Sequence, residues 1–366
     1  MNATMRRFVV GTAAVSMALS MVACGKAGSD NAGSGEGGSG NKTIGLLLPE
    51  NKTTRYETFD RPLIQGKIKS LCKDCEVAYN NASQDAETQK KQFDALITKG
   101  VKVIILDAVD ATATRPWVDA AAKKGVKVVA YDRLADGDVS AYVSYDNEKI
   151  GELQGQGVLE ALGDKAADSR LVMINGSPTD PNAGLFKRGA HKILDDKVKK
   201  VVYEQDIPDW SPDEANKKMA AAISSLGKDG FDGVYSANDG MAGGIATALK
   251  SAGVKDVPVG GQDAELAGLQ RILSGSQAFT IYKGIKPEAE TTAEIAVKLL
   301  NGDDIASLAP QKADSKSKKG IPTKLYTATI VTKDNIKDTI IKDKVYTAKQ
   351  ICTKDFADAC AKAGIK

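Results

Sequence analysis

Polar side chains follow two apolar runs near the middle of the chain. Asp132 and Arg133 come directly after one run, and Asp146 and Asn147 come directly after the next. Ligands of open α/β sheets bind outside the carboxyl ends of the strands, so we expect these four side chains to share one edge of a sheet. A carboxylate and a guanidinium together can hold a small polar molecule. The alternative interpretation is a surface ion pair followed by a helix cap.

The same pattern recurs later in the chain. Apolar runs end in short polar side chains at residues 175–177, at Asn238 and at Asp263. Such side chains both donate and accept hydrogen bonds, as the hydroxyl groups of a polyol require. Tyr56 and Trp210 lie in loops after predicted strands, where aromatic rings can cover the apolar faces of a sugar. Trp210 can instead serve only to support the start of the next helix.

Catalytic chemistry finds little support in the sequence. The only histidine is His191, and no motif of a hydrolase, a zinc protease or a nucleotide-binding loop is present. No nucleophile with a neighbouring base can be named. No calcium-loop pattern occurs either. We therefore expect a binding protein that is not an enzyme and that uses no metal and no cofactor.

The elements that must position these residues alternate between short apolar runs and amphipathic stretches. This alternation, seen over residues 44–131 and again over residues 148–273, is typical of βαβ units with parallel sheets. The sequence therefore predicts an α/β fold with two Rossmann-like lobes. We expect one lobe to contain residues 42–145 and 281–318, and the other to contain residues 146–280 and 319–366.

The start of the chain resembles a bacterial lipoprotein signal. Two arginines precede the apolar segment 8–22, and Ala23 and Cys24 follow it. This order predicts a signal peptide over residues 1–23 and lipidation of Cys24, with an ordinary secreted protein or an uncleaved anchor as alternatives. The Gly/Ser-rich residues 24–41 are typical of a flexible tether. No other apolar run reaches the length of about 20 residues that crosses a bilayer.

Charge and cysteines narrow the possible partners. Removing residues 1–23 lowers the net charge from +3 to +1, which argues against nucleic acid. Besides Cys24, the chain holds Cys72 and Cys75 in a C-x-x-C and Cys352 and Cys360 near its end. In an exported protein, proximity favours disulfides within each pair. A four-thiolate zinc site and a thioredoxin-like redox pair are the alternatives.

Several longer strings are spread over nearly the whole body of the chain. They are AYDR (130–133), SYDNEKIGELQ (144–154), GSP with D.NA.LF (176–186), AND (237–239), AGG (242–244), GQDAELAGLQRI (261–272), TIYK (280–283) and NIKDTIIKD (335–343). In sequence and in order, these strings resemble the periplasmic-binding-protein type 1 sugar receptors of ABC importers.

The resemblance implies two lobes joined by a three-strand hinge, which close on one monosaccharide and deliver it to a permease and its ATPase. It favours D-xylose over glucose, arabinose or galactose, and it implies a monomer on the outer face of the membrane, attached only through the lipid. A sensory receptor feeding a chemoreceptor or kinase is the alternative.

The implied sugar contacts are Asp132, Arg133, Asn147, Asn238, Asp263 and Lys283, with Trp210 and Tyr56 stacking on the ring, and Asp146 and Arg55 as further candidates. Lys187 stands where these receptors carry an arginine, so that contact lacks the bidentate fork.

Overall fold

The computed structural model describes residues 42–365. The expected signal peptide, the tether and Cys24 lie outside these residues. None of the helices described is both long enough and apolar enough to cross a membrane.

The first lobe is built on a seven-stranded sheet in which only the pair β10–β11 is antiparallel. The parallel strands β1, β3, β4 and β5 are buried along most of their length, as a sheet covered on both faces requires. In spatial order the strands are β10 (Gln311–Ala313), β11 (Ile321–Tyr326), β5 (Ala141–Tyr145), β4 (Lys127–Tyr131), β3 (Val103–Leu106), β1 (Thr43–Leu48) and β2 (Glu76–Asn81).

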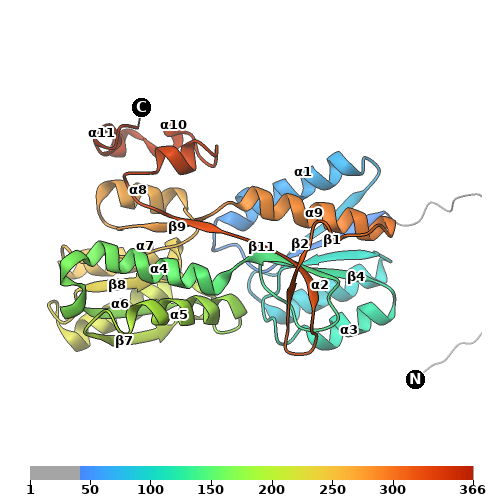
Figure 1. Ribbon diagram of the computed structural model, residues 1–366, viewed down its shortest axis with the longest axis horizontal. Helices are drawn as coiled ribbons and strands as arrows, with labels where there is room; N and C mark the ends of the chain where they lie inside the picture. The colour runs from blue at the N-terminus through green and yellow to red at the C-terminus, as the bar shows by residue number, and fades with distance from the viewer. Residues whose placement is uncertain (1–41, 366) are drawn as a thin grey trace, which may run out of the picture. The chain divides into compact units, whose positions relative to one another are not determined.

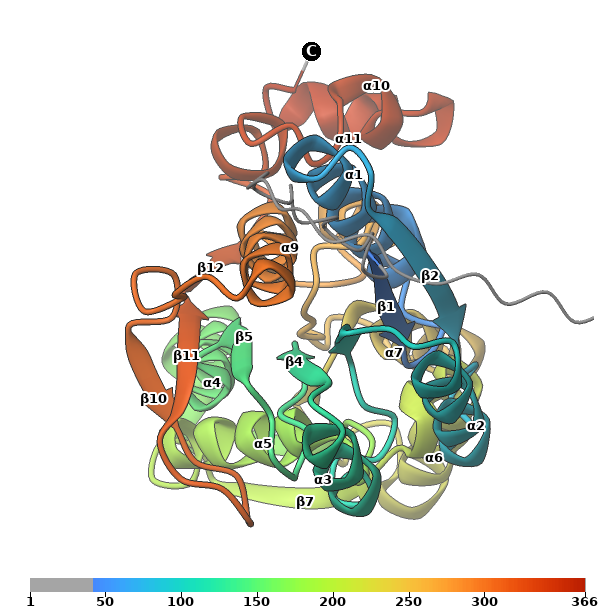
Figure 2. The same cartoon turned by 90° about the vertical axis from the view of Figure 1, so that its right-hand side faces the viewer.

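Helices cover both faces of this sheet. On one face, α1 (Arg61–Leu71) packs against α9 (Ile285–Asn301), and on the other lie α2 (Ala86–Thr98) and α3 (Arg115–Lys123) (Figure 2). A π-helical turn at Tyr56–Asp60 precedes α1. This turn brings Arg55 and Tyr56 to the carboxyl end of β1.

The second lobe repeats the arrangement around a smaller parallel sheet in the order β7–β6–β8. Beyond β8, a single isolated parallel bridge joins Val234 to Val259. The elements of this lobe are α4 (Asn147–Leu162), a 3-10 turn (Gly163–Asp168), β6 (Arg170–Asn175), α5 (Pro181–Leu194), β7 (Lys200–Asp206), a 3-10 turn (Pro208–Trp210), α6 (Pro212–Leu226), β8 (Gly233–Ser236), α7 (Asp239–Ala252) and α8 (Leu266–Ser274).

The chain passes between the lobes three times. It crosses from β5 into α4, from β9 (Thr280–Lys283) into α9, and from β11 into β12 (Ala328–Val331), which pairs with β9 (Figure 1). Here the structure differs from the expected boundary at residue 319, because β11 pairs with β5 in the first sheet. The alternating pattern of one strand does not tell which of two sheets it joins.

Residues 332–365 form a small cap whose apolar side chains share one core cluster with α8. It contains a π-helical turn (Lys337–Ile341), α10 (Ala348–Ile351), a 3-10 turn (Lys354–Phe356) and α11 (Ala357–Lys362). Its core packs on α8 of the second lobe, and the Tyr346 ring meets Phe59 of the first lobe edge-on, with ring centroids 5.5 Å apart.

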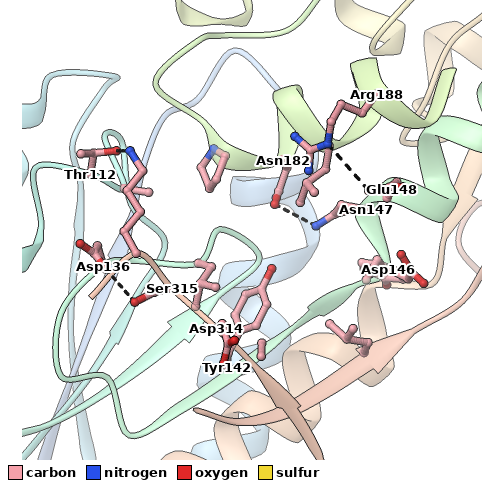
Figure 3. A pocket seen from close by; sticks show the side chains of 18 residues that line it. Thr112, Asp136, Tyr142, Asp146, Asn147, Glu148, Asn182, Arg188, Asp314 and Ser315 are labelled. Atoms are coloured by element: carbon pink, nitrogen blue, oxygen red, sulfur yellow. Dashed lines mark hydrogen bonds and ion pairs between the residues drawn. The ribbon is translucent and has the colours of Figure 1, made fainter. Parts of the chain in front are cut away.

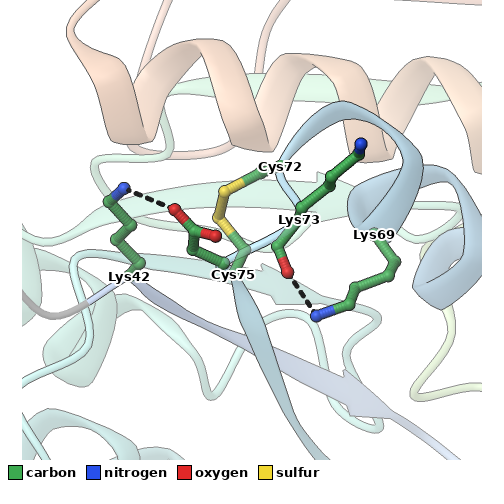
Figure 4. The surroundings of a disulfide bond; sticks show 6 residues. Lys42, Lys69, Cys72, Lys73 and Cys75 are labelled. Atoms are coloured by element: carbon green, nitrogen blue, oxygen red, sulfur yellow. Dashed lines mark hydrogen bonds and ion pairs between the residues drawn. A yellow bond between two sulfur atoms is a disulfide. The ribbon is translucent and has the colours of Figure 1, made fainter.

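Two disulfides join the cysteines that proximity had paired. Cys72 is bonded to Cys75, and Cys352 to Cys360, so these four residues have no thiolates left to hold zinc. Cys72 caps the C-terminal end of α1 (Figure 4). Thiolates are stabilised at helix N-termini rather than C-termini, so this position gives no support to a redox role for the C-x-x-C.

Candidate functional site

A small cavity with a free volume of about 20 Å³ lies where strand ends from both lobes meet. Eight of the residues expected at the site line it: Arg55, Tyr56, Asp132, Arg133, Trp210, Asn238, Asp263 and Lys283. Five further residues complete the wall: Thr53, Asp180, Asn182, Phe186 and Gln262. In this arrangement the side chains of the wall leave room for little more than one water molecule, which is well below the volume of a small-molecule site.

Arg55 is the best-anchored cation of the first lobe. Its Nε and Nη2 donate to the two carboxylate oxygens of Asp60 at 3.1 and 2.6 Å, and Nη2 also donates to Glu288 at 2.7 Å. Nη1 lies 3.5 Å from Asp132 Oδ2 and is buried without a hydrogen-bond partner. The buried carboxylates therefore fix the guanidinium so that one nitrogen stays available on the cavity side.

Asp132 is charged despite its burial. Burial alone would raise the pKa of this carboxyl, but Arg55, Lys283 and Arg133 outweigh it and hold the pKa below its ordinary value. Tyr56 adds a hydrogen bond from its hydroxyl to Asp132 Oδ2 at 3.1 Å. The site thus keeps a carboxylate that can accept hydrogen bonds from hydroxyl groups.

Arg133 is buried at the junction of the lobes. Nη1 donates to the carbonyl oxygen of Ala108 at 3.1 Å, and Nη2 donates to the Tyr56 hydroxyl at 3.3 Å. Nε lies 3.4 Å from Asp107 Oδ1 and 2.9 Å from Asp180 Oδ2. Asp180 belongs to the second lobe, so this ion pair crosses the cleft.

The second lobe contributes a buried ion pair and two amides. Lys283 Nζ lies 3.0 Å from Asp263 Oδ1, and the two carboxylates Asp263 and Asp132 keep the lysine pKa above its ordinary value although burial lowers it. Asn238 caps α7 through Oδ1, which accepts from Met241 N at 2.9 Å. Gln262 Oε1 is buried without a partner. These groups offer a cation, a carboxylate and amide atoms to a polar ligand.

Aromatic rings form the apolar part of the wall. Trp210 is 5% exposed, its Nε1 donates to Asp180 Oδ2 at 3.2 Å, and its ring centroid lies 6.5 Å from that of Phe186. Asp209 and Trp210 both have positive φ, as do Asp132 and Asp263. Positive φ is uncommon in residues other than glycine, and strained residues of this kind cluster at ligand sites.

Direct hydrogen bonds between the lobes surround the cavity. Thr54 N donates to Glu265 Oε1 at 3.2 Å, Asn182 Nδ2 donates to the carbonyl oxygen of Asp132 at 3.1 Å, and Ala111 N donates to that of Thr179 at 3.4 Å. Residues of the two lobes therefore meet across the cleft, and the structure represents a closed arrangement.

Three expected residues do not line the cavity. Asn147 and Asp146 line a neighbouring groove, where Asn147 Nδ2 donates to Asn182 Oδ1 at 2.8 Å (Figure 3). Asp146 caps α4 by accepting from Lys149 N at 3.1 Å. Lys187 Nζ pairs with Glu204 at 2.6 Å and Asp206 at 3.2 Å, away from the cavity wall. It follows Phe186 on α5, and that next helical position faces outward.

Sequence reasoning missed several residues of the wall. Asp180, Asn182 and Phe186 lie within the string that carried the resemblance, but none was proposed as a contact. An aspartate before proline at a helix start, as at Asp180, is the signal of an N-cap, and its side chain accepts from Asn182 N at 2.8 Å. That signal places the residue at the amino end of α5, which is the end facing the cleft.

The set of groups in the cavity suits binding rather than reaction. In the part of the chain that the structure describes, no group of three or more His, Cys, Asp and Glu side chains could hold a metal ion. The charged residues of the cavity wall are held in ion pairs with one another. Cations, carboxylates and amides at fixed positions can recognise hydroxyl groups, and the rings can cover apolar C–H groups.

Comparison with known proteins gives a consistent result. Residues 44–304 match the family described as periplasmic binding protein domain. The D-xylose-binding periplasmic protein of Escherichia coli K12 is 37% identical over 82% of this chain and 89% of its own length, and that of Haemophilus influenzae is 34% identical over 84% and 91%. The solved structure of a solute-binding protein of an ABC transporter from Clostridium phytofermentans, with bound β-D-glucose, is also similar. It is 27% identical in sequence, its TM-score is 0.75, and the match covers 84% of this chain and 99% of that protein.

Proposed function

We propose that this chain, which belongs to the family of periplasmic binding proteins, is the solute-binding component of an ABC sugar importer and binds one monosaccharide between its lobes. The observation that carries the proposal is the composition of the cavity. Three buried cations, several carboxylates and three aromatic rings from both lobes face one small space. A sugar presents hydroxyl groups around its rim and C–H groups on its faces, so it matches both kinds of wall.

Each part of the wall has a role in this proposal. Asp132 and Asp263 accept hydrogen bonds from sugar hydroxyls, and Arg55, Lys283 and the Asn238 amide donate to them. Trp210 and Phe186 cover one face of the ring. Hydrogen bonds between fixed charged groups and sugar hydroxyls discriminate strongly between one sugar and another, because a ligand that lacks a hydroxyl leaves a buried charge without a partner.

D-xylose is the sugar that we propose first. The curated relatives from E. coli and H. influenzae carry xylose in their names. Glucose is the second candidate, because the related C. phytofermentans protein was solved with it. The two sugars differ by one hydroxymethyl group, which in an apolar contact is worth about 1–3 kcal/mol.

The proposed mechanism is closure of the lobes on the sugar. Arg55, Tyr56, Asp132 and Arg133 belong to the first lobe, whereas Trp210, Asn238 and Asp263 belong to the second. A sugar makes all of its contacts only when the lobes meet, so its binding energy shifts an equilibrium between open and closed forms. The closed form would then dock on the permease.

We also propose that the chain is a monomer held on the outer face of the membrane by a lipid on Cys24. The proposed lipidation rests on the order of charged, apolar and small residues before Cys24, and the proposed monomeric state rests on the resemblance to the sugar receptors. Metabolic labelling with radioactive palmitate should mark the full chain and leave Cys24→Ser unmarked. Equal labelling of the two forms would remove the proposal of lipidation.

Calorimetric titration tests the proposed ligand. The full chain with Cys24→Ser would be titrated with xylose, glucose, arabinose, galactose and ribose, alongside Asp263→Ala. We expect xylose to bind in the micromolar range or tighter and Asp263→Ala to bind it at least about 100-fold more weakly, because Lys283 loses its buried partner. Asp303→Ala, at an exposed position, is the control. No heat with any of the sugars would refute the proposal.

Uptake measurements test the proposed role in transport. A strain that lacks this protein should lose uptake of radioactive xylose at low external concentration and regain it with the wild-type chain. A receptor that feeds a chemoreceptor or kinase would bind the same sugar but leave uptake unchanged. The two roles are therefore separated even though the binding site is the same.

A further inference from the structure

Asp180 makes contacts that its role as a helix cap does not explain. It is 5% exposed and lies in the loop between β6 and α5, at the edge of the cleft. One carboxylate oxygen, Oδ1, accepts from Asn182 N at 2.8 Å and so caps α5. The other oxygen, Oδ2, makes two contacts that have nothing to do with the cap.

The first contact of Oδ2 holds an aromatic wall of the cavity. Trp210 Nε1 donates to Oδ2 at 3.2 Å, and both Asp209 and Trp210 have left-handed backbone conformations, with φ of 59° and 53°. This conformation is unfavourable for a tryptophan, so the ring needs fixed partners to stay in place. Asp180 is the polar partner of this ring in the second lobe.

The second contact of Oδ2 crosses the cleft. Arg133 Nε of the first lobe lies 2.9 Å from Oδ2, but its N–H is not directed at the oxygen, so the contact is an ion pair rather than a hydrogen bond. The other contacts of Arg133, to Ala108, Asp107 and Tyr56, all lie within its own lobe. Separation of the lobes would therefore break the contact with Asp180 and leave the others intact.

We propose that Asp180 is a positioning residue that latches the closed form: one oxygen atom holds Trp210 over the sugar and receives Arg133 only when the lobes meet. Ring stacking and closure are thereby coupled through a single carboxylate. Asp107 lies beside Arg133 and can hold its charge in the open form. The inference rests on the proposed function for its ligand, but the closure that it describes can be measured without sugar.

The test uses Asp180→Asn in the full chain with Cys24→Ser. Asparagine caps helices as well as aspartate, so its single amide oxygen can keep the cap of α5, while the NH2 group in place of Oδ2 loses both the hydrogen bond from Trp210 and the charge facing Arg133. Asp85→Asn is the matched control, because Asp85 caps α2 in the same way, accepting from Thr88 N, but lies away from the cleft. Free thiols are then absent from the described residues, whose four cysteines form disulfides.

Closure is measured through a disulfide introduced across the cleft. Ala111→Cys and Thr179→Cys place two thiols where Ala111 N and the Thr179 carbonyl oxygen are 3.4 Å apart, so a mild oxidant cross-links the closed form. We expect Asp180→Asn to slow cross-linking about tenfold without sugar and to weaken xylose binding about tenfold, mainly through faster dissociation. Asp85→Asn should change neither, and the midpoint of unfolding without sugar should be the same in both variants.

The outcomes separate the inference from the proposed function. If Asp180→Asn cross-links at the wild-type rate, Asp180 is no latch, whether or not sugar binding has weakened. If cross-linking slows only together with a large drop in the unfolding midpoint, Asp180 is merely structural and the inference fails. If no sugar binds even the wild-type chain, the proposed function falls, while slower cross-linking in Asp180→Asn still supports the latch.

Discussion

Substitution of Gly176 by alanine should weaken sugar binding without changing any polar group of the site. Gly176 follows β6, and its backbone lies directly under the indole of Trp210. A Cβ placed on Gly176 would come within 2.5 Å of Trp210 Cζ2 and closer still to two other ring carbons. Its φ is not in the left-handed region, so alanine fits the backbone itself and the only cost is this clash.

The size of the effect follows from the geometry. Ordinary contacts of a Cβ begin at 3.4 Å, so the ring must shift by about 1 Å or more. Trp210 Nε1 is already 3.2 Å from Asp180, and such a shift can lengthen that hydrogen bond beyond its useful range. Overpacking of this kind costs about 1–3 kcal/mol. We therefore expect Gly176→Ala to weaken xylose binding by about tenfold or more.

Calorimetry and fluorescence together check this prediction. In a Trp117→Phe background, Trp210 is the only remaining tryptophan, so its emission should shift when Gly176→Ala displaces the ring. Gly184→Ala is the matched control, because a Cβ there meets only the end of Arg188, at 3.8 Å. Wild-type affinity and unchanged emission in Gly176→Ala would refute the placement of Trp210 against this backbone.

Three further predictions concern charge, pH and the disulfides. Lys283→Met should abolish measurable xylose binding in calorimetry and lower the midpoint of thermal unfolding, because Asp263 loses its buried partner at 3.0 Å; a stable variant that binds normally would contradict this. Burial raises the pKa of Asp239 to about 7 and that of Glu265 to about 8. From about pH 5 to 7 the folded chain therefore holds protons that the unfolded chain has released, so the free energy of unfolding should fall as the pH rises. In thermal melts at a series of pH values, the stability of Glu265→Gln should fall less steeply with pH than that of the wild type. An equal dependence on pH in the two proteins would contradict this prediction. Replacing Cys352 and Cys360 with serine should lower the free energy of unfolding by roughly 2.5 kcal/mol in urea titrations, because the bridge closes a short loop, while xylose affinity stays at the wild-type value; unchanged stability would show that the bridge contributes nothing to the cap.

Much of the fold could be predicted because periodicity is a local property. The alternation of apolar runs and amphipathic stretches indicated two α/β lobes, and both parallel sheets are present. The predicted lobe of β11 was wrong, because a strand with Ile321, Thr323 and Leu325 on one face and Pro322, Lys324 and Tyr326 on the other fits either sheet. Only pairing with β5 decides that it belongs to the first lobe.

The sequence by itself determined which strand ends carry polar residues, and eight of the expected residues line one cavity for that reason. Parallel strands bring their carboxyl ends to one edge of each sheet, so Asp132 comes to that edge in the first lobe, and Asn238 and Asp263 come to that edge in the second. Tertiary structure alone decided which side chains turn inward. Lys187 points away while Phe186 beside it lines the wall, and Asp180 reaches Arg133 across the cleft. Those outcomes depend on helix rotation and on how two separately folded lobes meet, which no local pattern encodes.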